Sequence, residues 1–316
     1  MGTGAAGTGA RGHGGTGVDG LLLVDKPAGP TSHDVVSAAR RALGERRVGH
    51  AGTLDPGATG LLVVLAGRAT RLARFVALLD KRYRGTIRFG WETTTDDAAG
   101  EPLEREESWR GRAPVEIAAA LARVAARPTQ RPPRVSAKKV AGERAYRLAR
   151  RGEAPELEAV PVAIHAITVE SFDPAAGDLV VDVRCGGGTY VRAIARDVGR
   201  ELGTRAHLAA LRRLAVGPWT AEEALALADI AAAPDALRPL AEAVRHLPVL
   251  EVERADAAAL AHGRKIEGAA GPGGPVAVVH AGRLVAVAEW RDGRYAPLVV
   301  LVEGGAEGEG GGRGGR

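Results

Sequence analysis

The first part of the chain alternates short apolar runs with segments of helical period. Residues 20–24 form a continuous apolar run, which predicts a short buried strand. Thr31 and Asp34 then have the spacing of a helix-capping motif, and Gly44 is placed to end the helix. The helical face between them carries Val35, Val36, Ala39 and Leu43. The pattern therefore predicts a strand followed by an amphipathic helix.

Two strands and a helix follow. Residues 61–65 predict a second buried strand, and residues 70–79 predict a helix with four apolar side chains inward: Leu72, Phe75, Val76 and Leu79. Residues 81–90 alternate, with arginines and a threonine on one face and larger apolar side chains on the other. Tyr83 lies on the inward face, where it is as well suited to the core as to a site.

The rest of the chain predicts an α+β fold. Pro114 begins an amphipathic helix, and residues 162–169 and 179–185 alternate like adjacent strands of one sheet. Residues 221–227 and 235–244 are interpreted as helices, and Leu247-Pro248 marks a boundary. Beyond it the period changes to that of strands, expected at 276–279, 284–290 and 297–302 with turns at Ala281-Gly282 and Asp292-Gly293.

Composition limits the possible classes of protein. The 316 residues suffice for about two domains, and 45% of them are apolar while only 3% are aromatic. The single cysteine, Cys185, excludes an intramolecular disulfide and multi-cysteine metal sites. Residues 1–19 and 304–316 are rich in glycine and are expected to be disordered. Without an apolar secretion signal or a membrane-length apolar run, we expect a soluble, cytoplasmic protein.

Positive charge is concentrated in one segment. The chain carries a net charge of +5. Residues 127–151 contain nine basic side chains against one acid, Glu143: Arg127, Arg131, Arg134, Lys138, Lys139, Arg144, Arg147, Arg150 and Arg151. Such a segment suits a phosphate backbone, although it could also be a solvated charged face. The acids within residues 91–110 have no ligand spacing, so that segment is interpreted as an exposed loop without a metal.

The strongest chemical signal is the run of residues 48–62. It holds one acid, Asp55, on a loop where Gly49, Gly52 and Gly57 permit close backbone approach and Pro56 disfavours helix. Asp-Pro-Gly on its own is also a common turn sequence. The whole run Val-Gly-His-Ala-Gly-Thr-Leu-Asp-Pro-Gly-Ala-Thr-Gly-Leu-Leu, however, closely resembles the catalytic-loop motif of the bacterial tRNA pseudouridine synthases that modify uridine 55 in the T loop.

Further motifs carry the same resemblance. Asp-Lys-Pro-x-Gly-x-Thr-Ser at 25–32 resembles the family's first motif, and Lys-Arg-Tyr at 81–83 resembles its second. Gly-Thr-Tyr-Val-Arg at 188–192 and the run at 206–217 resemble two later motifs. Three glycines before a helix could instead cradle a phosphate, but the lysine and Ser or Thr of a nucleotide loop are missing.

The resemblance implies roles for these residues. Asp55 is the nucleophile, Arg192 pairs with it, and Tyr83 stacks on the target base and is a candidate for proton transfer. Tyr190 packs under the arginine, Leu211 packs against the flipped base, and Lys26 supports the active-site floor. His50 is placed to occupy the position that the base vacates, although a core role for it is equally open; His207 is interpreted as structural. The binding contacts would come from His50, Lys26, Tyr190, Leu211, Arg131, Arg134, Lys138 and Lys139.

The resemblance also implies an architecture. Residues 20–246 would form a catalytic domain with a mixed, largely antiparallel sheet flanked by helices, and residues 247–303 a small PUA-like RNA-binding domain. The segment 127–151 resembles the family's RNA-binding loop and short helix, but Val135 stands where an aromatic is expected. The expected partner is the T stem-loop of tRNA, bound by a monomer without metal, nucleotide or other cofactor.

Two other functions stay open at this stage. A guide-RNA-dependent pseudouridine synthase subunit would share these motifs, although its usual basic extensions differ from the glycine-rich N-terminus here. An RNA-binding folding factor with a vestigial enzyme motif is the second alternative, and the intact set of Asp55, Tyr83 and Arg192 argues against it.

Overall fold

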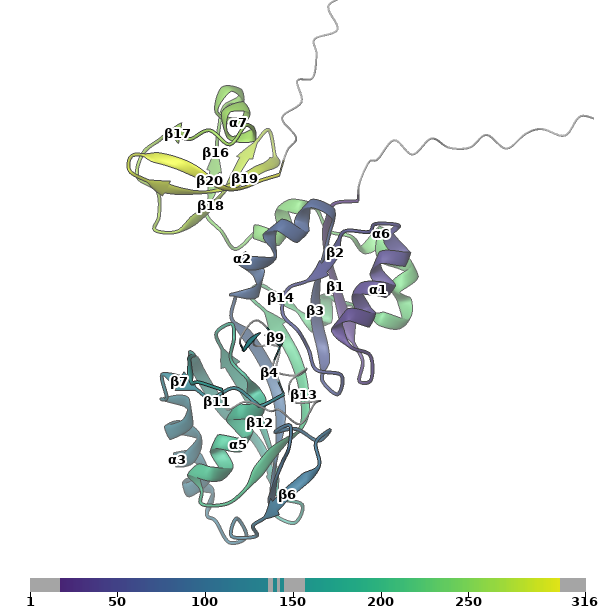
Figure 1. The fold of residues 1–316 in the computed structure, drawn as a ribbon, viewed down its shortest axis with the longest axis vertical. Coiled ribbons are helices and arrows are strands. Elements are labelled where there is room, and N and C mark those ends of the chain that lie inside the picture. Colours follow the sequence, from purple (N-terminus) through teal and green to yellow (C-terminus); the bar gives the residue numbers. More distant parts are fainter. Residues whose placement is uncertain (1–17, 136–138, 141–142, 145–156, 302–316) are drawn as a thin grey trace, which may run out of the picture.

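A nine-stranded sheet and a five-stranded sheet organise the chain in the computed structural model, which describes residues 18–135, 139–140, 143–144 and 157–301 (Figure 1). The order along the large sheet is β11 (Ile164–Asp173), β12 (Asp178–Cys185), β4 (Lys81–Phe89), β13 (Ala206–Val216), β3 (Thr59–Ala66), β1 (Gly20–Lys26) and β15 (Leu225–Ala226). Two short strands lie beside this path: β14 (Trp219–Thr220) pairs with β13, and β2 (Val48–His50) pairs with β3. Among the described strands of this sheet, β13 with β3 and β1 with β15 run parallel and all other pairs antiparallel, so the predicted mixed, largely antiparallel sheet is confirmed.

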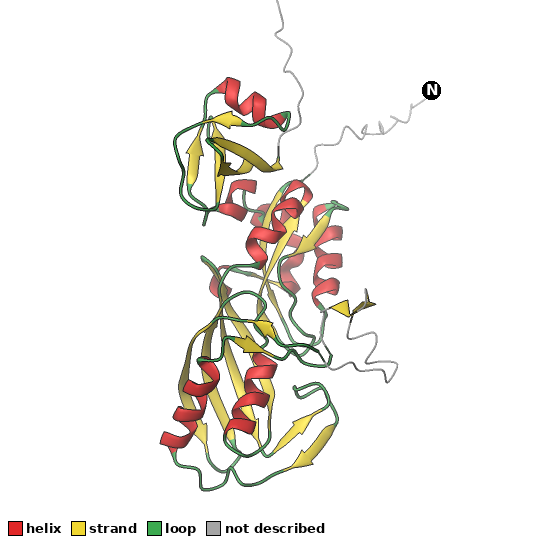
Figure 2. Ribbon diagram, turned by 60° about the vertical axis from the view of Figure 1, so that its left-hand side comes forward, coloured by secondary structure: helices red, strands yellow, loops and turns green. Residues whose placement is uncertain are grey.

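Helices cover this sheet in two groups. In the half that contains β4 and β12, α3 (Pro114–Ala125) and α5 (Val191–Glu201) lie side by side on one face (Figure 2). Their buried Leu121 and Ile194 join a core cluster with Val181 and Tyr83. In the other half, α1 (Ser32–Leu43) packs with α6 (Ala233–Ala236) over β1 and β3. The two halves meet where β13 lies between β4 and β3.

Local sequence signals predicted several of these elements well. α1 has Thr31 as its N-cap, a reciprocal capping box with Asp34, and Gly44 at its C-cap with φ 62°. Strand β4 alternates as expected, with Tyr83 buried. The adjacency of β11 and β12 and the helix from Pro114 are likewise confirmed.

The smaller sheet follows at the C-terminal end. Its order is β16 (Val249–Glu251), β18 (Pro275–His280), β19 (Arg283–Arg291), β20 (Arg294–Val300) and β17 (Ile266–Glu267), with α7 (Arg254–Ala261) packed against it. The hairpin turns fall where the sequence predicted them, and Ala281 and Asp292 have φ of 47° and 52° there. Three two-stranded pieces complete the strands: β5 (Trp91–Thr93) with β6 (Pro102–Arg105), β7 (Thr129–Gln130) with β10 (Val160–Pro161), and β8 (Lys139–Val140) with β9 (Glu143–Arg144).

The helix predicted at 70–79 is wrong in type and extent. The chain forms the 3₁₀ helix η1 (Gly67–Leu72) and then the short α2 (Ala73–Ala77). Three residues per turn bring positions i and i+3 into line. Arg68 and Arg71 in η1 share this spacing, Arg74 follows three residues later in α2, and their guanidinium groups donate to the carbonyls of Leu301, Val300 and Leu298 respectively. These contacts join the helical segment to the end of β20.

The two helices predicted at 221–227 and 235–244 are also wrong. Residues 221–223 form one 3₁₀ turn, η2 (Ala221–Glu223), after which Leu225 pairs with Val24 in β15. Pairing with β1 therefore overrides the local helical pattern. The second segment is divided among η3 (Leu227–Ala232), α6 and η4 (Leu240–Val244). Pro239 interrupts it, because the residue before a proline disfavours helical geometry.

The acidic segment 91–110 is not an exposed loop throughout, so that prediction is corrected. It contains the β5–β6 hairpin, and Glu92, Asp96 and Asp97 face three arginines on α5. Asp96 lies 2.7 Å from Arg196, and Glu92 lies 2.7 Å from Arg200. The acids could not be placed from sequence because their partners are about a hundred residues away.

Candidate active site

The loop between β2 and β3 carries Asp55, and the Lys26 side chain fixes it through a hydrogen bond to Pro56. The Lys26 ammonium donates to the carbonyl oxygens of Pro27 and Pro30 at 2.8 Å and of Pro56 at 3.0 Å. The side chain is completely buried, and burial lowers its pKa. All three of its hydrogens are thus used by the protein. Lys26 supports the floor as expected, but this placement does not fit the substrate contact that we also predicted.

Two more side chains fix the same loop. The Ser32 hydroxyl exchanges hydrogen bonds of 2.9 Å with the backbone N–H and carbonyl of Leu54. Arg213, only 1% exposed, donates to the carbonyls of Leu61, Gly52 and Thr53 at 2.6, 3.1 and 3.4 Å. Gly60 makes this approach possible: it has φ +99°, and a Cβ there would lie 2.2 Å from the Arg213 carbonyl. The loop is therefore shaped by buried contacts on several sides.

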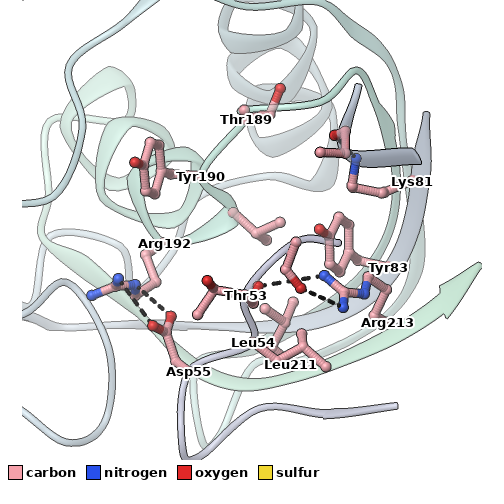
Figure 3. A pocket seen from close by; sticks show the side chains of 14 residues that line it. Thr53, Leu54, Asp55, Lys81, Tyr83, Thr189, Tyr190, Arg192, Leu211 and Arg213 are labelled. Carbon is pink, nitrogen blue, oxygen red and sulfur yellow. Dashed lines mark hydrogen bonds and ion pairs between the residues drawn. The ribbon is translucent and has the colours of Figure 1, made fainter. Parts of the chain in front are cut away.

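Asp55 and Arg192 form an ion pair at the mouth of the pocket (Figure 3). Arg192 Nε lies 3.0 Å from Asp55 Oδ2, and Arg192 Nη2 lies 3.4 Å from Oδ1. The arginine side chain is 7% exposed and the aspartate 40%. Arg192 also approaches Asp97 at 3.4 Å and donates to the carbonyls of Thr95 and Val135. The guanidinium is thus fixed, while the carboxylate keeps a face toward the pocket.

Opposing influences act on the Asp55 carboxyl group. Burial raises its pKa above the ordinary value, and the Arg192 guanidinium lowers it. The neighbouring Asp97 adds to the upward shift, and Lys26 opposes it. Arg192 therefore offsets part of the cost of keeping a charged carboxylate in a partly enclosed site.

The pocket beside Asp55 has a volume of about 230 Å³. Tyr83 and Leu211 line it from neighbouring strands, β4 and β13. Tyr83 is buried, which raises the pKa of its phenol, so the hydroxyl is neutral at physiological pH. An aromatic and an aliphatic side chain are both suited to pack against the face of a planar base.

The remaining predicted residues are distributed unevenly. Tyr190 lines the pocket at the start of α5, where its backbone N–H and carbonyl are both bound by the Gln130 amide at 2.9 and 3.1 Å. His50 ends β2 opposite Val64 and does not line the pocket. His207 is buried beside Trp91, which fits the structural role assigned to it.

The basic segment is only partly described. Arg127 pairs with Glu201 and with Asp197, so it is not an unbalanced cation as its sequence neighbours suggested. Arg131 and Arg134 are exposed, and the Arg131 carbonyl accepts a hydrogen bond from Arg196. Lys138 and residues 145–148, where a short helix was predicted, lie outside the described residues. Lys139 is described only through the backbone of β8.

Sequence reasoning gave no role to several pocket residues, among them Arg213, Lys81 and Thr189. Arg213 and Lys81 lie two positions from Leu211 and Tyr83 respectively, so strand alternation already places them on the same faces. Thr189 lies in the motif that supplied Tyr190 and Arg192. In residues 18–135, 139–140, 143–144 and 157–301, no group of three His, Cys, Asp or Glu side chains could hold a metal ion. Over the same residues, no helix has the length and apolar character that a membrane crossing requires.

Comparison with known proteins places this site in a family. Three family models match successive parts of the chain: the N-terminal domain of the TruB family pseudouridylate synthases at residues 40–191, the tRNA pseudouridylate synthase B C-terminal domain at 192–248, and the C-terminal domain of tRNA pseudouridine synthase II at 247–302. Together they cover the five-stranded sheet and every strand of the large sheet except β1.

Individual relatives agree with these models. The chain is 49% identical over 295 residues to the tRNA pseudouridine synthase B of Thermobifida fusca (strain YX), covering 90% of this chain and 99% of the relative. It is 46% identical over 290 residues to that of Leifsonia xyli subsp. xyli, covering 89% and 95%. A solved structure described as a Cbf5-Nop10-Gar1 complex shares the fold, with a TM-score of 0.69, 25% identity, and coverage of 90% and 85%. The chain therefore belongs to the TruB family of pseudouridylate synthases, and the resemblance seen in its motifs is confirmed.

Proposed function

We propose that this protein is a tRNA pseudouridine synthase, an isomerase that converts uridine 55 in the T loop into pseudouridine. The observation that carries the proposal is the Asp55–Arg192 pair, whose Nε and Oδ2 atoms lie 3.0 Å apart beside a cavity of about 230 Å³. The relative from T. fusca supports it, because 49% identity extends over nearly the whole of both chains.

The chemistry of the pocket suits this isomerisation. The reaction breaks the N1–C1′ bond of uridine and rejoins the same base through C5, so one nucleophile suffices. The Asp55 carboxylate would add to the base or to C1′, which divides one difficult step into two. Arg192 keeps that carboxylate charged and aimed. Tyr83 and Leu211 would hold the two faces of the base, and no residue of the pocket needs a metal or cofactor for this role.

The base must leave its stack before it reaches Asp55. Unstacking costs a few kcal/mol, which contacts elsewhere must offset. Stacking in the pocket and phosphate contacts from Arg131, Arg134, Lys138 and Lys139 are the available contributions. His50 would remain near the vacated position rather than in the pocket. We infer that the bound partner is the T stem-loop of tRNA and that the protein acts as a monomer.

We further propose that two parts of the chain have different functions. Residues 20–246 would form the catalytic unit, and residues 247–303 a PUA-like unit that binds the RNA stem. Support comes from the five-stranded sheet, all of whose strands fall between Val249 and Val300. The terminal segments 1–19 and 304–316 have no part in this proposal.

The two alternatives are less well supported. A guide-RNA-dependent subunit has the same fold, but the identity to the Cbf5 complex is 25%, about half of that to the T. fusca relative. A folding factor with a vestigial motif would have no need of a preserved carboxylate–guanidinium pair in a recessed cavity.

A direct assay tests the proposal. The purified protein is incubated with an unmodified tRNA transcript, and pseudouridine is mapped by position. We expect one product at position 55, without added guide RNA or metal. A transcript with cytidine at position 55 is the matched control and should give no product. Activity that requires a guide RNA, or no pseudouridine at all, would overturn the proposal.

A further inference from the structure

The pocket has a second polar end, away from Asp55. Lys81 and Thr189 line it, and Figure 3 shows both well separated from Asp55 and Arg192. Lys81 is the first residue of β4 and shares the inward face of that strand with Tyr83. It is 7% exposed, which is rare for a lysine and calls for hydrogen-bond partners.

The hydrogen bonds at this end are incomplete. The Lys81 ammonium donates to the carbonyl oxygens of Ala77 and Leu79, at the end of α2. An ammonium has three hydrogens, so one is left for the cavity. The buried Thr189 hydroxyl has no partner in ordinary hydrogen-bond geometry among the described residues, apart from the weakly bonding thiol of Cys185. The Lys81 ammonium and the Thr189 hydroxyl thus both have hydrogen-bonding capacity that the protein itself does not use.

We propose that Lys81 and Thr189 read the O4–N3 edge of the target uracil and so select uridine. This inference rests on the proposed function. With C1′ and N1 of the target beside Asp55, and the ring between Tyr83 and Leu211, the opposite edge of the base points to the other end of the pocket. That edge of uracil presents O4 as an acceptor and N3–H as a donor. Lys81 donates to O4, and the Thr189 hydroxyl accepts from N3–H.

The same arrangement rejects cytidine. Cytosine presents an amino group in place of O4 and an unprotonated N3, so the donors of Lys81 would face the donors of the amino group. A site built to hydrogen-bond one group discriminates strongly against an analogue that leaves buried donors unpaired. Burial and the nearby Arg213 lower the pKa of Lys81 to about 8. The ammonium is therefore still charged at pH 7, and a further acceptor such as O4 of the base stabilises the charged form.

Binding to altered bases tests the assignment of Lys81. Two T-arm stem-loops are compared, one with uridine at the target position and one with 4-thiouridine, which keeps N3–H and replaces the O4 acceptor by sulfur, a weaker acceptor. All proteins carry Asp55→Asn to prevent turnover. We expect the background protein to prefer uridine by about tenfold, the size of a charged hydrogen bond. Lys81→Met, which keeps the length of the side chain, should reduce that preference below about twofold.

Control variants separate recognition from folding. Arg74→Met removes an exposed cation from α2, the helix whose end Lys81 contacts, and this variant should keep the full preference for uridine. If Lys81 only caps α2, Lys81→Met will lower the melting temperature and weaken the binding of both stem-loops by the same factor. That result overturns the assignment. Thr189→Val supplies a second test that does not depend on Lys81→Met folding. This variant should prefer uridine over the 2-pyrimidinone nucleoside, which lacks N3–H as well as O4, by a smaller factor than the background protein does; an undiminished preference overturns the role of Thr189.

The proposed function has its own readout in the same experiment. Wild-type protein is assayed for pseudouridine on the stem-loop that carries uridine. Product formation together with an unchanged preference in Lys81→Met overturns the edge-reading assignment alone. Binding without any product from the wild type overturns the proposed function.

Discussion

Two buried arginines lie on opposite sides of the Asp55 loop and have different roles. Arg192, on α5, directs its guanidinium to the carboxylates of Asp55 and Asp97 as well as to two carbonyls. Arg213, on β13, donates to the backbone carbonyls of Leu61, Gly52 and Thr53 and also interacts with the Tyr83 hydroxyl, but with no carboxylate of the loop. One arginine therefore controls charge at the site, and the other controls the shape of the loop.

This difference separates chemistry from architecture within one pocket. Removal of Arg192 leaves a carboxylate without its counter-charge, which changes when Asp55 is ionised. Removal of Arg213 leaves several buried carbonyls without donors, which costs folding free energy. The following substitutions test whether the two contributions are as distinct as the contacts indicate.

Asp55→Asn should have the largest effect on activity. The amide keeps the shape of the side chain on a loop still held by Arg213, but it cannot act as the nucleophile. We expect pseudouridine formation to fall by about a thousandfold or more, measured by single-turnover kinetics at saturating tRNA. Binding of tRNA, measured in parallel, should be nearly unchanged. Turnover close to that of the wild type would remove Asp55 from the mechanism.

Arg192→Met should come next, with a loss of about a hundredfold at neutral pH. Burial already raises the pKa of Asp55, and this substitution removes the guanidinium that lowers it. The carboxylate then becomes protonated at a higher pH, so the acid limb of the rate profile should move upward. A single-turnover pH series measures this limb, and Arg213→Met provides the comparison because it leaves the ion pair in place.

An unchanged acid limb in Arg192→Met would mean that the arginine acts by position and not by charge. A shift of equal size in both variants would contradict the distinction between the two arginines. Partial recovery of the rate at higher pH in Arg192→Met is the specific sign of an ionisation effect.

Arg213→Met should affect stability more than pH dependence. The substitution keeps the length of the side chain but deprives the carbonyls of Leu61, Gly52 and Thr53 of their donor. We expect the free energy of unfolding to fall by about 2–4 kcal/mol, measured by urea titration. Arg192→Met is the matched variant on the other side of the loop. If the two lose equal stability, shape and charge are not separable here.

The sequence located Arg192 and missed Arg213 for a physical reason. Arg192 stands in a distinctive motif, whereas Arg213 is one of two adjacent arginines on an alternating strand. Only burial tells them apart, since Arg213 is 1% exposed while Arg212 pairs at the surface with Asp25. Burial depends on the neighbouring strand, which comes close to Arg213 only because position 60 is glycine.

The fold was predictable where signals are local. The caps of α1 and the alternation of β4 lie within a few residues of what they determine. Contacts between distant residues were not predictable: Leu225 pairs with Val24, and Asp96 faces Arg196. Both involve segments that look helical or solvated on their own, and tertiary packing decides the outcome.

The smallest effect on catalysis is expected from the basic segment, where charge serves binding. Each Lys or Arg that meets a phosphate should steepen the log-log salt dependence of tRNA binding by about 0.7 to 0.9 units. Replacing Arg131, Arg134, Lys138 and Lys139 together with Ala should flatten that slope by up to about three units. The rate at saturating tRNA should fall much less, because these residues are assigned to holding the RNA and not to the chemistry. Arg127→Ala is the matched control: Arg127 is already paired with Glu201 and Asp197, so its loss should leave the slope almost unchanged. If the quadruple variant also keeps its slope, the segment is a solvated face, and the RNA must dock elsewhere, with the five-stranded C-terminal sheet as the first place to look.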